Sequence, residues 1–237
     1  MNGFDAAVLS FLNQFAQQSW SFDKFVVVFS EVNLIKGAAV VALLWWLWFQ
    51  QSPNQDKTRT LILTTCLACP IALFLSKSAG MILPFRSRPI YVEELSLVLP
   101  HTMRAGAIET WSSFPSDHAV FFFALATGIF FISKRVGWLA FFYVLLVICF
   151  PRLYINYHYP TDVIAGALLG SVVAFLVLSA SPIKKFMKEK GLGWCQRHPA
   201  SFYAFFFLVS YQIANLFWES RQILKWAVYM ARLVVEK

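Results

Sequence analysis

Charged residues are scarce in this chain. Asp, Glu, Lys and Arg make up 14% of its 237 residues, whereas hydrophobic residues make up 59% and aromatic residues 18%. A soluble domain usually carries about 25% charged residues, so this composition, with a mean hydropathy of +0.61, excludes an ordinary soluble protein. The sequence also lacks internal repeats, low-complexity segments and any gap between hydrophobic stretches that would hold a second domain. We therefore expect one integral membrane domain over residues 1–237.

Cysteine is equally sparse, with four residues. Cys66 and Cys69 form a C-x-x-C inside a hydrophobic stretch, where two small buried residues are a better interpretation than a redox or metal pair. The N-terminus lacks the basic region and the small-residue cleavage site of a signal peptide. Its Phe and Leu residues are mixed with Asn and Gln, which predicts an amphipathic helix lying in the membrane interface as scaffolding.

Long hydrophobic stretches run through the rest of the sequence. A transmembrane helix needs about 20 mostly apolar residues, and the stretches that meet or approach this length lie at roughly 32–50, 60–82, 118–133, 137–157, 161–181 and 200–218. Beyond them, apolar residues at helical spacing predict a second interfacial helix, namely Ile223, Leu224, Ala227, Met230, Leu233 and Val234. The predicted fold is all-α, a polytopic membrane helical bundle of about six transmembrane helices with terminal interfacial helices.

Basic residues outside the polar motifs predict the orientation of the bundle. If the central helices alternate in direction, one side receives Lys57, Arg59, Lys134, Arg135, Lys184, Lys185, Lys188, Lys190 and Arg197. The positive-inside rule makes that side cytoplasmic, so the polar motifs are expected to face out of the cytosol. Basic residues near the C-terminus count against this orientation: Arg221, Lys225, Arg232 and Lys237. The net charge of +8 lies mostly in such connections and, without an aromatic and basic binding module, indicates no nucleic-acid partner.

Ionisable residues gather where the hydrophobic stretches end. Arg88 follows the second stretch and His118 opens the third. Arg152 and His158 end the fourth, and Asp162 opens the fifth. Because successive helices reverse direction, all of these residues are predicted to lie at the same membrane face. Ionisable residues at such places usually mark a functional site.

These residue types suit phosphate-ester chemistry. Arg88 and Arg152 are expected to clamp phosphate oxygens through bidentate, permanently charged hydrogen bonds. A neutral His158 imidazole can attack phosphorus if Asp162, four residues later, orients it and stabilises its developing charge. If Pro160 begins the next helix, Asp162 lies in its first turn. His118 is then the general acid that protonates the leaving oxygen.

The start of the third stretch offers further phosphate donors. The Ser116 hydroxyl and the backbone N–H groups after it are expected to bind phosphate oxygens at a helix N-terminus. This scheme requires no cofactor and no metal. A zinc site built from His, Asp and His is the competing interpretation, but nearby Arg side chains make such a site electrostatically poor for a divalent cation.

The motifs resemble those of the type 2 phosphatidic acid phosphatase family of membrane lipid phosphatases. Its signature has three segments, KxxxxxxRP, PSxH and SRxxxxxHxxxD. The matching residues are Arg88, Pro89, Pro115, Ser116, Asp117, His118, Arg152, His158 and Asp162, all within 77–162. The resemblance implies a six-helix core and a metal-independent phosphatase with His158 as nucleophile and His118 as acid.

Two positions depart from this signature. Pro151 stands where the third segment has Ser, and Met81 stands where the first has Lys. Lys77, one turn earlier, or Arg86 is expected to supply the missing charge, and both alternatives stay open. The substrate phosphate-binding residues predicted on this basis are Arg88, Arg152, Ser116, Asp117, Arg86 and Lys77.

The substrate class follows from the same resemblance. Short bacterial members with an Arg-x-Arg-Pro segment and an outward-facing site look similar to undecaprenyl-diphosphate phosphatases, so a polyprenyl diphosphate is the leading expectation for the lipid partner. Phosphatidylglycerol-phosphate, phosphatidate and lipid A phosphatases share the same catalytic residues and remain alternatives. Vanadium haloperoxidases share them too, but those enzymes are soluble. A phosphate-lipid binding or transport protein without turnover is the alternative from another class.

Overall fold

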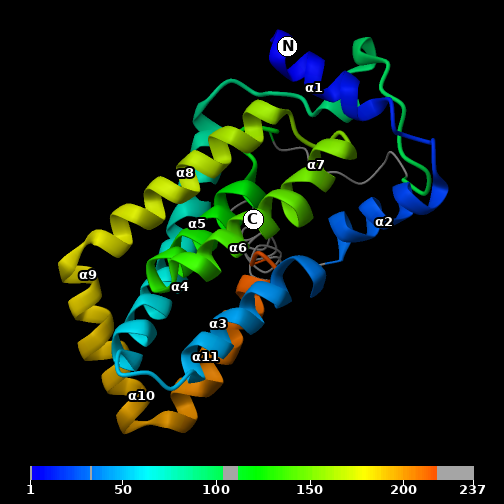
Figure 1. Ribbon diagram of the computed structural model, residues 1–237. Helices are drawn as coiled ribbons and strands as arrows, with labels where there is room; N and C mark the ends of the chain where they lie inside the picture. The colour runs from blue at the N-terminus through cyan, green and yellow to red at the C-terminus, as the bar shows by residue number, and fades with distance from the viewer. Residues whose placement is uncertain (1, 33, 104–111, 218–237) are drawn as a thin grey trace, which may run out of the picture.

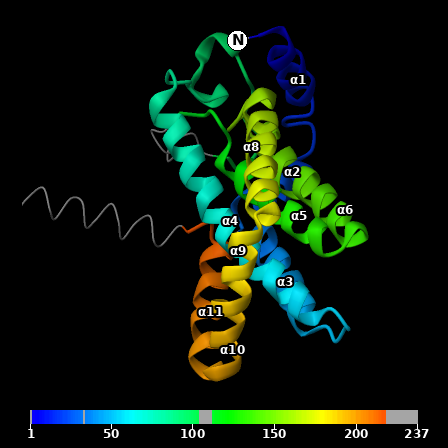
Figure 2. The ribbon, with the colours of Figure 1, turned by 90° about the vertical axis from the view of Figure 1, so that its left-hand side faces the viewer.

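The computed structural model describes residues 2–32, 34–103 and 112–217, and within these ranges the regular secondary structure is entirely helical. The centre of the bundle consists of α4 (Gln55–Ile82), α5 (Asp117–Ile132) and α8 (Pro160–Ser179). Each of these three helices packs on the other two, most extensively α5 on α8, and they run side by side in Figures 1 and 2. The all-α prediction is confirmed.

The next layer adds helices on both sides of this centre. A helical segment from Lys134 to Tyr154 comprises α6 (Lys134–Tyr143), a π-helical stretch (Val144–Cys149) and α7 (Phe150–Tyr154). A bent pair follows the N-terminal helix: α2 (Trp20–Glu31) packs on α7, and α3 (Ala39–Phe49) packs on α4 and on α11 (Pro199–Ala214). Short helices α9 (Ser181–Phe186) and α10 (Gly193–Arg197) lead into α11.

Helices long and apolar enough to cross a membrane agree in position with the predicted stretches. Among the described residues there are three, at Gln55–Ile82, Lys134–Tyr154 and Pro160–Ser179, and a fourth if Trp20–Glu31 and Ile35–Phe49, bent by 66°, form one broken span. The remaining two predicted spans are shorter apolar helices, α5 and α11. The short length of α5 suits its place, since residues 119–129 are buried by protein rather than exposed to lipid.

Glycine allows α5 and α8 to approach closely. A Cβ atom at Gly170 would lie 2.0 Å from the carbonyl oxygen of Val120, and one at Gly166 would lie 2.7 Å from that of Ser116. Small residues at helix contacts are the usual means of close packing in membranes. Here they bring the N-terminal ends of α5 and α8 to one level, and both ends carry predicted site residues.

The two ends of the bundle differ in what covers them. At the end where α8 begins lies α1 (Gly3–Asn13), the predicted N-terminal amphipathic helix, which packs on α7 and α8 (Figure 1). At the other end Lys57, Lys184, Lys185 and Lys188 line one hollow together with Glu189. The predicted C-terminal interfacial helix lies outside the described residues.

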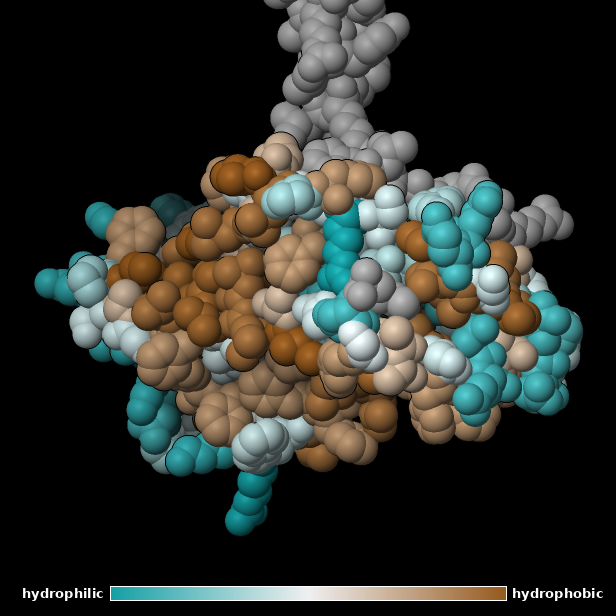
Figure 3. All heavy atoms as spheres, turned by 90° about the horizontal axis from the view of Figure 1, so that it is seen from above, coloured by the Kyte–Doolittle hydropathy of each residue, from teal (hydrophilic) through white to brown (hydrophobic). Residues whose placement is uncertain are grey.

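Exposed apolar side chains surround the bundle. They include Phe74 on α4, Leu139 on α6, Leu168 on α8 and Phe207 on α11, each more than half exposed. Figure 3 shows such side chains across much of the face seen from above, with polar side chains interspersed. An apolar surface of this extent fits contact with lipid acyl chains rather than with water.

Candidate active site

The starts of α5 and α8 meet through the backbone. The N–H of Ser116 donates to the carbonyl oxygen of Asp162 at 3.1 Å. Ser116 is the buried N-cap residue of α5, so Asp117 and His118 occupy the first turn of that helix. The predicted convergence of the second and third motifs is therefore present in the structure.

A tight turn between α7 and α8 carries His158. Asn156 in this turn adopts φ = 61°, a left-handed conformation that Asn tolerates better than most residues. Its carbonyl oxygen accepts a hydrogen bond from the N–H of Ile90 at 3.0 Å, which ties the turn to the segment after Arg88. The first and third motifs are thereby held side by side.

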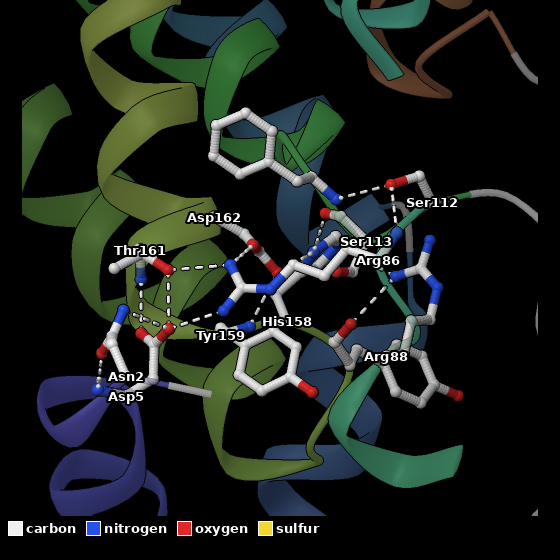
Figure 4. Close-up of polar contacts among 12 residues, drawn as sticks. Asn2, Asp5, Arg86, Arg88, Ser112, Ser113, His158, Tyr159, Thr161 and Asp162 are labelled. Atoms are coloured by element: carbon white, nitrogen blue, oxygen red, sulfur yellow. Dashed lines mark hydrogen bonds and ion pairs between the residues drawn. The ribbon is translucent and has the colours of Figure 1, made fainter. Parts of the chain in front are cut away.

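The hydrogen bonds of His158 define its tautomer. Its Nδ1 atom lies 2.9 Å from the carbonyl oxygen of Ser113. A carbonyl oxygen only accepts, so Nδ1 carries the hydrogen. The Nε2 atom lies 3.2 Å from Nη1 of Arg88, and a guanidinium only donates, so Nε2 presents its lone pair. Figure 4 shows His158 in the same cluster as Ser113 and Arg88.

Asp162 lies beside His158 but does not receive its closest hydrogen bond. Pro160 begins α8, as predicted, which puts His158 before the helix and Asp162 at its third residue. The Oδ2 atom of Asp162 accepts from the N–H of Tyr159 at 2.9 Å and lies 3.6 Å from Nδ1 of His158. The Ser113 carbonyl therefore fixes the ring, and the fully buried Asp162 carboxylate adds negative charge next to it.

Burial keeps His158 neutral. Loss of hydration lowers the pKa of this imidazole below its usual 6.5, the adjacent Asp162 carboxylate opposes that change, and the positive charges of Arg88 and Arg152 add to it. The unprotonated imidazole is the form that can act as a nucleophile.

Arg152 contacts the other imidazole. Its Nη2 atom lies 2.8 Å from Nε2 of His118 and donates to the carbonyl oxygen of Ser30, on α2, at 3.0 Å. The guanidinium is buried, and its Nε atom has no hydrogen-bond partner among the described residues. Each imidazole therefore faces one guanidinium, His158 that of Arg88 and His118 that of Arg152.

The two candidates for the missing motif Lys are both paired with carboxylates. Lys77, on α4, forms an ion pair with Asp117, whose other oxygen accepts from Ser76 at 2.7 Å. Arg86 donates to Asp162 at 2.5 Å and to Asp5, on α1, at 2.6 Å. The structure therefore gives both cations a defined place and leaves the choice between them open.

The structure adds site residues that the sequence analysis did not single out. The buried Ser113 supplies a carbonyl to His158, and its hydroxyl has no partner among the described residues. Asp5 and Thr161 bind Arg86. Backbone contacts such as that of Ser113 have no sequence signature, whereas a lone carboxylate in an otherwise apolar helix, as at Asp5, is a signal that could have been used.

In residues 2–32, 34–103 and 112–217, no three His, Cys, Asp or Glu side chains gather so that they could hold a metal ion. Cys66 and Cys69 are free thiols inside α4, of which Cys69 is buried and Cys66 partly exposed.

Comparisons with known proteins agree with the motifs. Residues 82–186 match the model of the PAP2 superfamily. The chain is 30% identical to the bacitracin transport permease protein BcrC of Bacillus licheniformis, over 69% of this chain and 74% of that protein. It is also 30% identical to the putative undecaprenyl-diphosphatase YbjG of Escherichia coli, over 70% of this chain and 75% of that protein.

A further relative aligns over a shorter region. The undecaprenyl-diphosphatase BcrC of Bacillus subtilis is 28% identical over 42% of this chain and 47% of that protein. No solved structure matches the chain. The matched region contains Arg88, His118, Arg152, His158 and Asp162, the residues that the helix ends bring together. On these grounds the chain belongs to the PAP2 superfamily and is a membrane-embedded phosphatase.

Proposed function

We propose that this phosphatase hydrolyses the terminal phosphate of undecaprenyl diphosphate through a phospho-histidine intermediate. The observation that carries the mechanism is the pairing of each imidazole with a guanidinium, Arg88 with His158 and Arg152 with His118. Phosphate oxygens are stronger acceptors for guanidinium than imidazole nitrogen is. A terminal phosphate bound by both Arg side chains would take these donors and expose both Nε2 atoms to the reacting group.

His158 acts as the nucleophile in the first step. Its Nε2 lone pair attacks the terminal phosphorus, and the bond from phosphorus to the bridging oxygen breaks. The imidazole becomes positively charged while its Nδ1–H stays on the Ser113 carbonyl. The Asp162 carboxylate, 3.6 Å from Nδ1, stabilises that charge.

His118 supplies and later recovers the proton. Its Nε2 atom faces the Arg152 guanidinium in the structure and takes up a proton when the bound diphosphate replaces that contact, because phosphate charge favours the imidazolium. The imidazolium then protonates the bridging oxygen as undecaprenyl phosphate leaves, and the neutral ring accepts a proton from the water that attacks the phospho-histidine. The nitrogen–phosphorus bond breaks, inorganic phosphate leaves, and His158 returns to its neutral form. Ser116 and the N–H groups of the first turn of α5 bind the transferring oxygens.

The second phosphate of the substrate needs its own cation. Lys77 is suited to this role because it pairs with Asp117 in the first turn of α5. Ser76 donates to the same Asp117 carboxylate and helps to fix it there. In this proposal Asp117 contributes by orienting Lys77, since a carboxylate alone repels phosphate. The names of two relatives as undecaprenyl-diphosphatases support the polyprenyl substrate.

We also propose that the site opens to the outer face of a bacterial plasma membrane. The site lies at the end of the bundle where α1 packs on the start of α8 (Figure 1). The hollow lined by Lys57, Lys184, Lys185 and Lys188 lies at the other end. The positive-inside rule assigns the lysine-rich end to the cytoplasm.

Phosphate release tests the proposed function. The detergent-purified protein, in excess chelator, is given undecaprenyl diphosphate, phosphatidylglycerol phosphate, phosphatidate and lipid A in parallel. We expect fastest release from undecaprenyl diphosphate and a loss of about a thousandfold or more in His158→Ala. His198→Ala, at an exposed position near α10, is the matched control. Preference for another lipid would overturn the substrate, and activity that survives in His158→Ala would overturn the nucleophile.

A second candidate function has one observation in its favour, the name of one relative as a transport permease. A transporter would need phosphate-binding Arg side chains but neither a nucleophile nor an acid. A reaction quenched in alkaline detergent decides between the two, because phosphohistidine survives in base and is hydrolysed in acid. An acid-labile phosphoryl group on His158 supports the phosphatase, whereas lipid binding without phosphate release from any of the four lipids supports transport.

A further inference from the structure

The helix α1 reaches into the site through Asp5. The Oδ2 atom of Asp5 accepts from Nη2 of Arg86 at 2.6 Å, and Nη1 of the same guanidinium donates to Oδ1 of Asp162 at 2.5 Å. Asp162 in turn lies 3.6 Å from Nδ1 of His158. Figure 4 shows Arg86 between the two carboxylates, joined to both. One chain of contacts thus runs from α1 to His158.

Thr161 closes this chain into a network. Its hydroxyl accepts from Arg86 at 2.8 Å and donates to Asp5 at 2.7 Å. Its backbone N–H lies at the start of α8, where N–H groups have no acceptor within the helix, and it donates to Asp5 at 2.9 Å. The Arg86 guanidinium also stacks 3.8 Å from the centre of the Tyr159 ring. The Arg86 guanidinium is therefore held by Asp162, by Asp5 with Thr161, and by the face of the Tyr159 ring.

The network contains two fully buried carboxylates and one partly exposed guanidinium. The side chains of Asp5 and Asp162 have no exposed surface, whereas that of Arg86 is 27% exposed. Burial by itself would raise the pKa of Asp5, but hydrogen bonds from Thr161 and Arg86 outweigh it and hold the pKa below its usual value. The three charges sum to minus one, and His158 stands next to that charge.

We propose that Asp5 is a positioning residue of the active site, which sets, through Arg86, the charge and orientation that Asp162 presents to His158. Asp5 lies outside the three sequence motifs, and α1 is therefore part of the catalytic apparatus rather than scaffolding alone. The inference rests on the proposed role of His158 as nucleophile. It also assigns Arg86 to Asp162 and leaves Lys77 as the cation for the second phosphate.

The proposal predicts the direction in which each substitution shifts the pKa of His158. In Asp5→Asn the three-residue network becomes neutral, so Arg86 offsets Asp162 fully and the pKa of His158 falls. In Arg86→Gln the network carries two negative charges, and the pKa of His158 rises. In the double variant the charge returns to minus one, and the pKa returns toward that of the unmodified protein. A purely structural role of Asp5 predicts no such reversal.

The experiment combines two measurements on the full-length protein in detergent. The first is an NMR titration of His158 in protein labelled with ¹³C-histidine, which is feasible with four histidines and assigned with His158→Gln. The second is kcat and KM for phosphate release. We expect kcat of Asp5→Asn to fall about tenfold with little change in KM, and the double variant to recover part of that loss. Opposite pKa shifts in the single variants support the proposal.

Asp23 provides the matched control. It is also a fully buried carboxylate of the N-terminal helices, but it accepts from Tyr154, from the N–H of Gln17 and from the N–H of His101. Asp23→Asn is expected to leave the His158 titration unchanged. The proposal is overturned if Asp5→Asn leaves both titration and kcat unchanged, or if Asp23→Asn shifts the titration equally. If Asp5→Asn does not fold by itself, the double variant is compared with Arg86→Gln. Removal of the Asp5 charge in that background should lower the pKa of His158. Expected titration shifts without any phosphate release would refute the proposed function and leave the coupling intact.

Discussion

Arg152 joins the two halves of the site, because its Nη2 atom lies 2.8 Å from Nε2 of His118 while its own helix leads into the turn that carries His158. The same Nη2 atom donates to the Ser30 carbonyl on α2. The guanidinium thus links α7, which carries it, to α2 and to α5. Both contacts use the two hydrogens of this one nitrogen, which leaves the rest of the planar guanidinium for phosphate oxygens.

Replacement of Arg152 by Lys is therefore expected to be severe although it keeps the charge. The Lys ammonium ends one bond short of the position of Nη2 and cannot bind a phosphate bidentately, so kcat/KM should fall about a hundredfold. Phosphate release by Arg152→Lys, beside Arg135→Lys at the far end of the bundle, measures the effect. An Arg152→Lys enzyme with normal kcat/KM would show that only the charge matters.

The pH dependence of the reaction should report His158. Because burial lowers the pKa of this imidazole, the neutral nucleophile persists to lower pH, and the acidic limb of kcat/KM should lie below the usual 6.5 of an exposed imidazole. Arg88 contributes to the lowering, so the residual activity of Arg88→Gln should show that limb shifted to higher pH. The substrate ionises identically in both assays, and an unchanged limb in Arg88→Gln would argue against His158 as the titrating group.

Much of this fold and site could be predicted from the sequence, for reasons that particular residues make plain. The spans are long apolar runs, and Pro160 marks the start of α8 in the sequence as it does in the structure. The convergence of His118, His158 and Asp162 follows because successive helices reverse direction.

The contacts that refine the site could not be predicted in this way. The carbonyl oxygens of Ser113 and Ser30 bind His158 and Arg152, and any residue type could supply them. The bend of 66° between α2 and α3 has no Pro or Gly pair in the sequence that would predict it. Asp5 contacts Arg86 across 81 positions, a distance that no local pattern encodes.

Lys77 is expected to distinguish diphosphate from monophosphate substrates. If it binds the second phosphate, Lys77→Met should raise KM for undecaprenyl diphosphate about tenfold, which is the loss of about 1.4 kcal/mol, and leave KM for phosphatidate nearly unchanged. Asp117→Asn should have a smaller effect of the same kind, since Lys77 keeps its charge but loses its partner. Lys134→Met, at the start of α6, is the control. Equal effects on both substrates would assign Lys77 to general anchoring.

Cysteine labelling of intact cells tests the orientation. Ser96 and Lys188 are both exposed. Ser96 lies in the connection between α4 and α5 and Lys188 in the connection between α8 and α11, which alternating helices put at opposite ends of the bundle. A membrane-impermeant maleimide should label Ser96→Cys in intact cells and Lys188→Cys only after the membrane is opened. The native cysteines give a low background because three are buried and Cys66 lies within α4. Labelling in the reverse order would place the site in the cytoplasm.

Gly170 should be intolerant of even a methyl group. A Cβ atom there would lie 2.0 Å from the Val120 carbonyl oxygen, so Gly170→Ala forces α8 away from α5 and should cost about 1–3 kcal/mol of unfolding free energy. That cost outweighs the gain in helix propensity that Ala normally brings. Gly3→Ala is the matched control, because a Cβ atom at Gly3 meets nothing within 4 Å. Denaturant unfolding in detergent gives the free energies. Since the same contact holds Ser116 beside Asp162, Gly170→Ala should also lower kcat, and a destabilised variant with normal kcat would show that the site tolerates movement between α5 and α8.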